Sequence, residues 1–289
     1  MDTTARPYAG ERKDLKPTFD NAATTDEIRL LARALAATDD DRYRRAAERG
    51  VDYILKAQYP NGGWPQFHPP PTTYHRHITL NDGAMVRLMS LCREVARSDQ
   101  FRFLGNDRRE LATTAFDKGL HCLLRCQVKV DEKLTVWCAQ HDEKDFRPRP
   151  GRTYELVSLS GGESVGVVEL LMSLDRPSAE VVRAVDSAVA WFEAAKLTGI
   201  RQSVVDDSKG PRGRNKVVVA DPAAPPLWAR FYEIGTNKPL FADRDGMAKY
   251  ALADIGYERR NGYAWYGSWP ARLLADDYPA WKKRVSGGK

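Results

Sequence analysis

The stretch DDDRYRRAAERGVDYILKAQYPNGGWPQ, residues 39–66, decides the fold class of this chain. Its three leading aspartates can cap a helix, and the apolar side chains that follow recur at helical spacing up to Leu55. Asn61-Gly62-Gly63-Trp64-Pro65 then stops the helix, because glycine and proline break helices and favour tight turns. The stretch therefore predicts a capped helix that ends in a structured loop.

The same alternation of helix and loop extends over the rest of the chain. Helical spacing predicts helices within 26–57 and at 82–97, with Asn81 or Asp82 as cap, then at 108–128, 163–174 and 179–195. Extended segments are expected at 134–139 and 228–233, and a surface loop at 198–215. Many helices, few strand candidates and long loops indicate an all-α fold of antiparallel helix hairpins, with functional loops at one end. We assign 1–25 to an N-terminal extension or extended segment and 26–289 to a single domain.

Composition and charge narrow the class of partner. The chain has 289 residues, 42% of them hydrophobic, which suits one large globular domain. The net charge is +6 and the pI is about 9.1. A basic surface favours a polyanion, which could be nucleic acid, an anionic membrane surface or an acidic polysaccharide. No apolar run is long enough to span a bilayer, and residues 1–16 lack the apolar core of a signal peptide.

The cysteines and histidines do not indicate a metal site. Cys122 and Cys126 lie one helical turn apart, but no CxxC or HxxxH pattern accompanies them. We therefore expect these two cysteines, with Cys92 and Cys138, to be buried thiols or a disulfide rather than zinc ligands. Three histidines crowd the loop at residues 68–77 without a metal-binding spacing, so hydrogen bonding within the loop is the favoured role.

Three acidic residues near helix starts or in loops are candidate ligands. Asp82, Asp142 and Glu163 could each serve as a helix cap or a first-turn charge, because anions suit that end of a helix. As a set, oxygen ligands from separate loops are what calcium prefers. No EF-hand loop is present, so a calcium site would have to be assembled from distant segments.

The C-terminal third combines arginines with aromatic residues. Arg230, Arg244, Arg259 and Arg260 stand among tryptophans and tyrosines. Guanidinium groups recognise carboxylates at two points, and aromatic faces suit sugar rings or stacked arginine. The alternative is a layer of solvated charge over a tyrosine-rich core. The density of arginines in aromatic frames favours an anion site.

Taken together, seven blocks of sequence resemble family 10 polysaccharide lyases, the pectate lyases with an (α/α) toroid. The resemblance runs from about Ala47 to Trp281. The blocks are Lys56-Ala57-Gln58 leading into Asn61-Gly62-Gly63-Trp64-Pro65-Gln66; Ile78-Thr79-Leu80-Asn81-Asp82-Gly83-Ala84-Met85; Trp137-Cys138-Ala139-Gln140-His141-Asp142; Tyr154-Glu155-Leu156 with Ser158-Leu159-Ser160 and Glu163-Ser164; Pro225-Pro226-Leu227-Trp228-Ala229-Arg230-Phe231-Tyr232-Glu233; Asn237-Lys238-Pro239 with Asp243-Arg244-Asp245-Gly246; and Glu258-Arg259-Arg260-Asn261-Gly262-Tyr263-Ala264-Trp265-Tyr266-Gly267.

The resemblance implies a mechanism and a set of site residues. It implies cleavage of α-1,4-linked polygalacturonate by calcium-assisted anti-β-elimination, with an arginine as the base and a 4,5-unsaturated product. Arg230 is the expected base, with Arg260 and Arg214 as alternatives. The expected calcium ligands are Asp82, Asp142 and Glu163. The expected substrate-binding residues are Asn81, Tyr232, Arg244, Arg259, Arg260 and Tyr263.

The resemblance also sets expectations for the whole protein. It implies one catalytic domain over 26–289, a monomer with no nucleic-acid or membrane partner, and a secreted or periplasmic location with the export signal removed. Two alternatives remain open: a glycoside hydrolase on an α/α barrel, which needs two carboxylates roughly 5–9.5 Å apart, and a non-catalytic module that binds acidic polysaccharide. A terpene cyclase would need an apolar cavity, which the arginine- and aspartate-rich loops disfavour.

Overall fold

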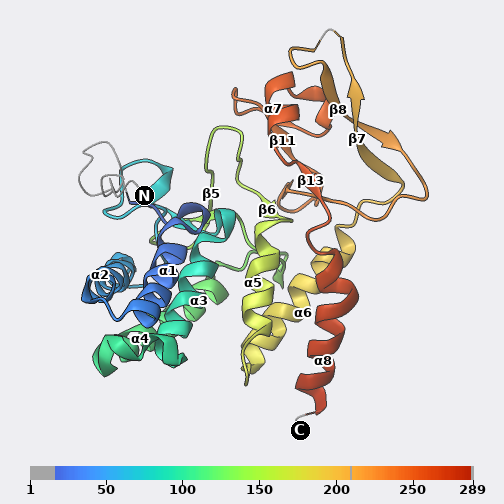
Figure 1. The fold of residues 1–289 in the computed structure, drawn as a ribbon. Helices are drawn as coiled ribbons and strands as arrows, with labels where there is room; N and C mark the ends of the chain where they lie inside the picture. Colours follow the sequence, from blue (N-terminus) through green and yellow to red (C-terminus); the bar gives the residue numbers. More distant parts are fainter. Residues whose placement is uncertain (1–16, 209, 288–289) are drawn as a thin grey trace. The chain divides into compact units, whose positions relative to one another are not determined.

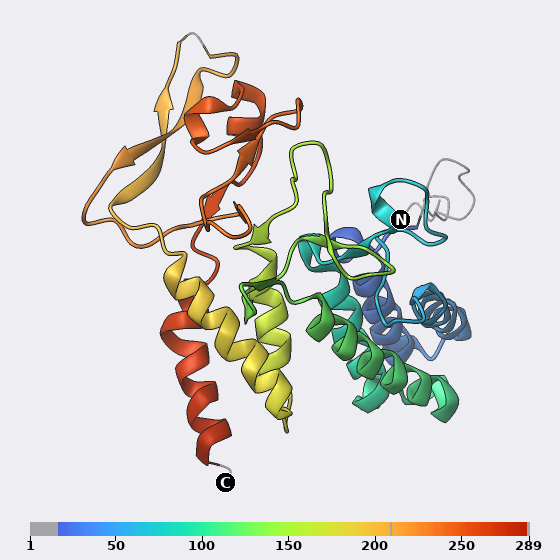
Figure 2. The same cartoon turned by 180° about the vertical axis from the view of Figure 1, so that it is seen from behind.

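The computed structural model describes residues 17–208 and 210–287, so most of the expected N-terminal extension, residues 1–16, lies outside the described residues. The chain forms two compact units, each of which is described by itself (Figures 1 and 2). Unit 1 runs up to Leu123 and includes Asp142–Phe146, whereas unit 2 comprises Leu124–His141 and the chain from Arg147 onward. Within the described part of the chain, every helix is too short or too polar to cross a bilayer.

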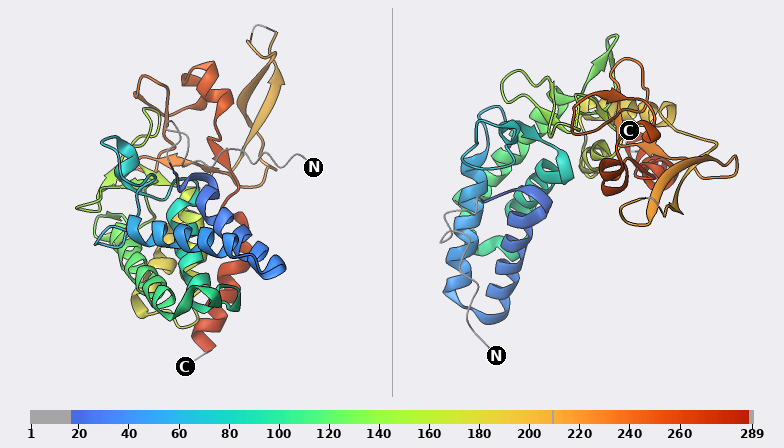
Figure 3. Two further views of the ribbon diagram at one scale, coloured as in Figure 1. Left: turned by 60° about the vertical axis from the view of Figure 1, so that its left-hand side comes forward. Right: turned by 90° about the horizontal axis from the view of Figure 1, so that it is seen from above.

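Unit 1 is helical. Its helices are α1 (Ala23–Thr38), α2 (Asp41–Ala57), α3 (Ala84–Arg97) and most of α4 (Gly105–Cys126). Short 3-10 turns η1 (Asp20–Ala22), η2 (Tyr74–Arg76), η3 (Asn81–Gly83) and η4 (Asp99–Leu104) and the two-residue strand β1 (Ile78–Thr79) join them. Helix α1 packs along α2, as the blue ribbons of Figure 3 show. The predicted aspartate cap is confirmed, because Asp40 Oδ1 accepts the backbone N–H of Arg42 at 2.8 Å.

The loop after α2 folds as its glycines require. Trp64 is fully buried, and its indole N–H donates to the carbonyl of Ile54 at 3.0 Å. Gly62 has a φ of 94°, and a β-carbon there would lie 2.1 Å from the carbonyl oxygen of Lys118. Only glycine tolerates both the left-handed backbone and this close approach to α4. The loop is therefore a rigid connection.

Unit 2 combines four helices with short antiparallel strand pairs. The helices are α5 (Glu163–Met172), α6 (Ala179–Ala194), α7 (Tyr257–Gly262) and α8 (Tyr278–Gly287), with the 3-10 turn η5 (Leu252–Asp254) and the π-helical turn η6 (Leu273–Asp277). The strand pairs are β2 (Lys129–Val130) with β3 (Lys133–Leu134), β4 (Gln140–His141) with β5 (Pro148–Arg149), β6 (Leu159–Ser160) with β10 (Phe231–Tyr232), β9 (Trp228–Ala229) with β13 (Tyr266–Gly267), and β11 (Phe241–Ala242) with β12 (Ala248–Lys249).

One further strand pair corrects an expectation from the sequence. The stretch 198–215 was expected to be a surface loop, but it contains β7 (Ile200–Asp206) and the start of β8 (Arg214–Ala220), which form a hairpin of two seven-residue strands. None of its fourteen strand residues is fully buried. Because neither face of the hairpin is buried, its strands do not require alternating apolar and polar residues. Its polar composition therefore resembles that of a loop.

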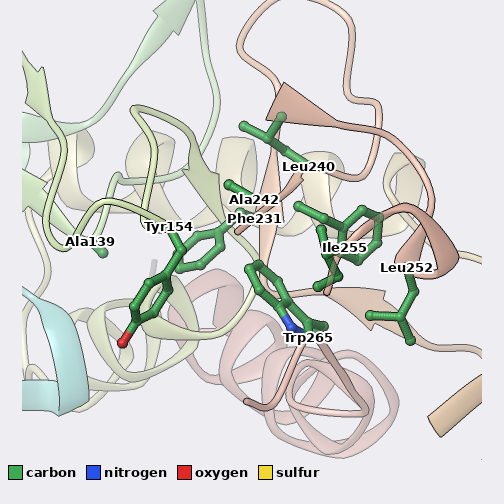
Figure 4. Close-up of a cluster of buried hydrophobic side chains, with 9 residues drawn as sticks. Ala139, Tyr154, Phe231, Leu240, Ala242, Leu252, Ile255 and Trp265 are labelled. Carbon is green, nitrogen blue, oxygen red and sulfur yellow. The ribbon is translucent and has the colours of Figure 1, made fainter. Parts of the chain in front are cut away.

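The core of unit 2 lies beneath its loops. Nine buried side chains form one apolar cluster: Ala139, Tyr154, Phe231, Leu240, Phe241, Ala242, Leu252, Ile255 and Trp265 (Figure 4). Trp265 is fully buried and meets Phe231 and Phe241 edge to face, with ring centroids 6.1 and 5.6 Å apart. Segments that are far apart in the sequence are thereby fixed together. The polar residues on these segments are therefore held in fixed positions.

The cysteines are structural. All four are buried thiols rather than disulfides. Burial raises the pKa of the Cys92 thiol to about 12. The expectation of buried thiols is confirmed, and the alternative of a disulfide is wrong.

Candidate functional site

In unit 1, Asp82 precedes α3 in an unusual backbone conformation. Asp82 has a φ of 51° and its Oδ2 accepts the side-chain N–H of Asn81 at 2.6 Å. The N-cap of α3 is Gly83, which makes no side-chain capping bond. The prediction that Asn81 or Asp82 caps this helix is therefore wrong. Because a non-glycine residue with positive φ is uncommon and costs free energy, the conformation suggests a role other than capping.

The side chain of Asn81 places a buried amide oxygen next to Asp82. The residue is 5% exposed, and its Oδ1 has no hydrogen-bond donor among the residues that the structure describes. A buried carbonyl oxygen without a donor is rare and costs free energy. Beside the carboxylate of Asp82, it supplies a second hard oxygen ligand of the type that calcium prefers.

Asp142 lies in a turn of unit 1 and is 8% exposed. Its Oδ1 accepts the backbone N–H groups of Lys144 and Asp145 at 2.9 and 3.2 Å. With His77 and Glu143 it forms a group whose ligand atoms all lie within 4.8 Å of one another. Asp82 is not part of this group.

Glu143 was not singled out from the sequence, although it directly follows Asp142. Its carboxylate pairs with the guanidinium of Arg76 at 2.7 Å and with His77 Nδ1 at 3.1 Å. Burial raises the pKa of Glu143, but hydrogen bonds from its own backbone N–H and from His77, together with the charge of Arg76, outweigh it, and the pKa lies below its ordinary value. Glu143 therefore carries a negative charge beside Asp142 that is already compensated by Arg76.

The residues present fit a calcium ion in their donor chemistry. Unit 1 supplies the carboxylates of Asp82 and Asp142 and the unsatisfied amide oxygen of Asn81. Glu163, the third predicted ligand, belongs to unit 2. Within unit 1, the hard oxygens of Asn81, Asp82 and Asp142 match the donor preference of Ca²⁺.

In unit 2, Glu163 forms a shielded ion pair with Arg230. Glu163 is the first residue of α5, and its backbone N–H donates to the hydroxyl oxygen of Ser160 at 3.0 Å. A guanidinium nitrogen of Arg230 lies 2.5 Å from Glu163 Oε1, with the two side chains 14% and 9% exposed. The carboxylate stabilises the charged form of the guanidinium.

The backbone holds Arg230 as tightly as its side-chain partner does. Arg230 stands between strands β9 and β10, and its N–H donates to the carbonyl of Trp265 at 2.7 Å. Its own carbonyl accepts the N–H of Gly161 at 2.9 Å, and a β-carbon at Gly161 would lie 2.2 Å from the carbonyl oxygen of Ala229. The guanidinium is therefore presented from a fixed frame, as the aromatic neighbours in the sequence predict.

Four arginines surround two tyrosine rings, and we call this set the arginine–tyrosine cluster: Arg152, Arg230, Arg244, Arg259, Tyr154 and Tyr263. The guanidinium carbon of Arg230 lies 5.0 Å from the ring centre of Tyr263. That of Arg259 lies 4.6 Å from the ring centre of Tyr154, and that of Arg152 lies 5.0 Å from the same ring. Stacked guanidinium groups keep their edges available for carboxylates.

Arg244 and Arg259 share a carboxylate partner. Glu258 accepts hydrogen bonds from the Nε atoms of both, at 3.0 and 2.7 Å. Hydrogen bonds from Arg259 and Arg244 lower the pKa of Glu258 to about 2. A cavity of about 520 Å³ opens here, lined by residues that include Arg212, Tyr257, Glu258 and Arg259. Such a cavity can admit an anionic sugar.

Three other predicted site residues have mainly structural contacts. Tyr232 is fully buried, and its hydroxyl donates to the carbonyl of Ala195 and accepts the N–H of Ala229, both at 2.8 Å. Arg260 binds Asn215 Oδ1 at 3.0 Å and the carbonyls of Ala253 and Ile255 at 3.1 and 2.9 Å. These positions suit support of the site rather than contact with a polymer. Arg214 is exposed on β8, where its carbonyl accepts the hydroxyl of Tyr257.

Comparison with known proteins identifies the class. The family model described as pectic acid lyase matches residues 2–274. The chain is similar to a solved family 10 polysaccharide lyase from Cellvibrio cellulosa, with 34% identity, a TM-score of 0.82, and coverage of 91% of this chain and 81% of that one. An aspartate-to-alanine variant of a family 10 polysaccharide lyase from the same organism, solved in complex with trigalacturonic acid, matches with the same identity and TM-score and is covered to 82%. The comparison with curated proteins gave no match.

The fold and these matches define a polysaccharide lyase. The similarity confirms the predicted fold class, the all-α (α/α) toroid with few short strands. The chain belongs to the pectic acid lyase family, as the motifs of its sequence predict.

Proposed function

We propose that this pectate lyase cleaves α-1,4-linked polygalacturonate by β-elimination and releases 4,5-unsaturated oligogalacturonides. The observation that supports it best is the arginine–tyrosine cluster, in a chain whose relative of known structure holds trigalacturonic acid. Each sugar residue of the polymer carries one carboxylate, and guanidinium groups fixed against aromatic rings recognise carboxylates at two points. Arg244, Arg259 and Tyr263 are the proposed substrate-binding residues in unit 2, and Asn81 is the one in unit 1.

The reaction cleaves the C4–O4 bond of the polymer without adding water. A base removes the proton from C5, the electron pair of that C–H bond forms the C4–C5 double bond, and the C4–O4 bond breaks. The departing O4 takes up a proton. Negative charge develops on the uronate next to C5, and cations placed beside it stabilise the transition state.

Calcium is the proposed cofactor, and it would supply positive charge next to the substrate carboxylate. Asp82, Asp142 and Glu163 are the proposed ligands, with Asn81 Oδ1 as a further oxygen. The protein's own contribution is to hold these oxygens on rigid turns and at a helix start.

Arg230 is the proposed base. The backbone around Arg230 is rigid, and its side chain is 14% exposed. Burial disfavours the charged form of a side chain. The contact with Glu163 acts in the opposite direction, so the carboxylate has to be turned away or neutralised before Arg230 can accept a proton. Substitution by lysine at 230, 260 and 214 separates the candidates. Lysine at the position of the base should lower kcat strongly and leave the dissociation constant for oligogalacturonate unchanged. Lysine at a position that only holds substrate should raise that dissociation constant and leave kcat near the wild-type value.

Ultraviolet absorbance of the unsaturated uronide tests the proposed reaction. Polygalacturonate should give rising absorbance together with new reducing ends. Highly methyl-esterified pectin should react poorly, because the ester removes the carboxylate charge. Reducing ends without absorbance would identify a hydrolase, and binding without either signal would identify a binding module.

A further inference from the structure

We propose that Glu155 is a positioning residue, which fixes the guanidinium of Arg230 by holding the ring of Tyr263. The inference rests on the proposed lyase function of Arg230. Glu155 is 3% exposed and lies in the core of unit 2, so it acts through other residues and not on the polymer. None of the motif arguments from the sequence gives it a role.

The carboxylate of Glu155 is bound on several sides. It accepts the hydroxyl of Tyr263 at 2.7 Å, the backbone N–H of Arg152 at 3.0 Å, and the guanidinium of Arg152. Gly151 allows this packing, because a β-carbon there would lie 2.6 Å from Glu155 Oε2 and 2.5 Å from Gln140 Oε1. The carboxylate therefore has little room to move.

The loop that carries Glu155 is closed on itself. The N–H of Gly151 donates to the carbonyl of Glu155 at 2.9 Å, and the N–H of Glu155 donates to the carbonyl of Arg152 at 2.7 Å. Burial raises the pKa of Glu155, but the hydrogen bonds from Arg152 and Tyr263 outweigh it, and the pKa lies below its ordinary value. A charged, immobile acceptor is thus aimed at the hydroxyl of Tyr263.

The ring of Tyr263 is the surface against which Arg230 rests. Its centre lies 5.0 Å from the guanidinium carbon of Arg230 and 5.7 Å from that of Arg152. Trp265 and Tyr154 meet the ring at 4.9 and 5.4 Å and fix its body. The hydroxyl end is held by its hydrogen bond to Glu155. Loss of that bond lets the ring tilt and moves the face that Arg230 contacts.

This role predicts a specific kinetic effect. A shift of about 1 Å in a reacting group can reduce the rate on the order of 100-fold. The change acts on the transition state, so kcat should fall while KM stays within about twofold. A residue that binds substrate would instead raise KM, and a residue that only stabilises the fold would lower the concentration of active enzyme.

The experiment uses Glu155→Gln, Tyr263→Phe and the double variant of the full chain. Formation of unsaturated product from polygalacturonate gives kcat and KM, and near-ultraviolet circular dichroism checks the fold. Tyr263→Phe keeps the ring, which is the part of Tyr263 proposed to contact substrate, and removes only the hydroxyl that Glu155 holds. KM should therefore stay unchanged, and this variant tests the idea even where Glu155→Gln folds poorly. Each single variant should lose about 10- to 100-fold in kcat. The double variant should fall no more than about twofold below the worse single one, because both act through one hydrogen bond.

A matched control exists in the helices of unit 2. Asp186 on α6 likewise binds a tyrosine hydroxyl, that of Tyr278 at 2.9 Å, and a cation, Lys282 at 2.5 Å. Asp186→Asn should leave kcat unchanged. A raised KM with normal kcat in the Glu155 or Tyr263 variants, or losses that multiply in the double variant, would overturn the positioning role. Absence of unsaturated product from the wild-type enzyme would instead overturn the proposed function.

Discussion

Replacement of Glu163 by glutamine should destabilise unit 2 strongly, because it leaves Arg230 charged and shielded from water. The two side chains are 9% and 14% exposed, and their closest atoms lie 2.5 Å apart. Opposite charges about 4 Å apart at an effective dielectric constant near 20 attract by about 4 kcal/mol. Removing one member of such a buried pair typically costs about 3–5 kcal/mol. We expect Glu163→Gln to lower the free energy of unfolding by this amount.

Tryptophan fluorescence during denaturant unfolding measures this change. Six of the seven tryptophans belong to unit 2, so the signal reports mainly on that unit. The control is Glu193→Gln, because Glu193 and Lys196 form a surface pair whose side chains are 48% and 31% exposed. A surface pair contributes about 0–1 kcal/mol, so the control should change the unfolding free energy by no more than that.

The double variant Glu163→Gln with Arg230→Gln separates charge from packing. Replacing both members of a buried pair is often nearly neutral, so the double variant should lie within about 2 kcal/mol of the wild type. The reasoning is refuted if Glu163→Gln costs no more than the control. It is also refuted if the double variant is as unstable as the single one, because the loss would then come from shape and not from an uncompensated charge.

Three further predictions concern the cofactor, the core and pH. A calcium chelator should abolish product formation and added calcium should restore it, whereas full activity in excess chelator would contradict the calcium assignment. Tyr232→Phe should lower the unfolding free energy by about 2–4 kcal/mol, because the buried N–H of Ala229 and carbonyl of Ala195 lose their partner, while the exposed Tyr250→Phe should leave the denaturation midpoint unchanged. The depressed pKa of Glu155 stabilises the fold above its ordinary value of 4.5, and this contribution disappears as the pH falls through that value toward the folded pKa. The unfolding free energy measured against pH should therefore drop less steeply in acid for Glu155→Gln than for the wild type.

The helices could be predicted from the sequence because their signals are local. Buried positions Ala47, Val51 and Ile54 of α2 follow the apolar spacing, and Asp40 caps the helix as its residue type predicts. The start of α3 could not be predicted in this way. Asp82 resembles a cap in sequence, but its left-handed backbone turns the chain before the helix begins at Ala84. A cap depends on backbone angles that residue type alone does not specify.

The site could be predicted in part, because contacts between distant segments leave no pattern in sequence. Arg230 and Arg259 stand out in the sequence by their aromatic surroundings, and Tyr263 is expected from the family resemblance. The structure brings all three into one cluster. Arg152 is not among the site residues expected from the sequence, yet it stacks on Tyr154. Glu155 was quoted in a motif without a role, since nothing local shows that it meets Tyr263, 108 residues away.

The three candidate bases show why residue type and motif do not assign a chemical role. Arg260 donates to two backbone carbonyls and to Asn215, so its guanidinium holds η5 and β8 in place. Arg214 is exposed on β8, where its backbone carbonyl accepts the hydroxyl of Tyr257. Arg230 alone combines a rigid backbone, a tyrosine face and a shielded carboxylate. That carboxylate stabilises the proton that a base must first lose. Whether Arg230 can accept a proton therefore depends on whether Glu163 remains charged and paired with it. The position and charge of Glu163 during the reaction decide the mechanism more directly than the choice of arginine.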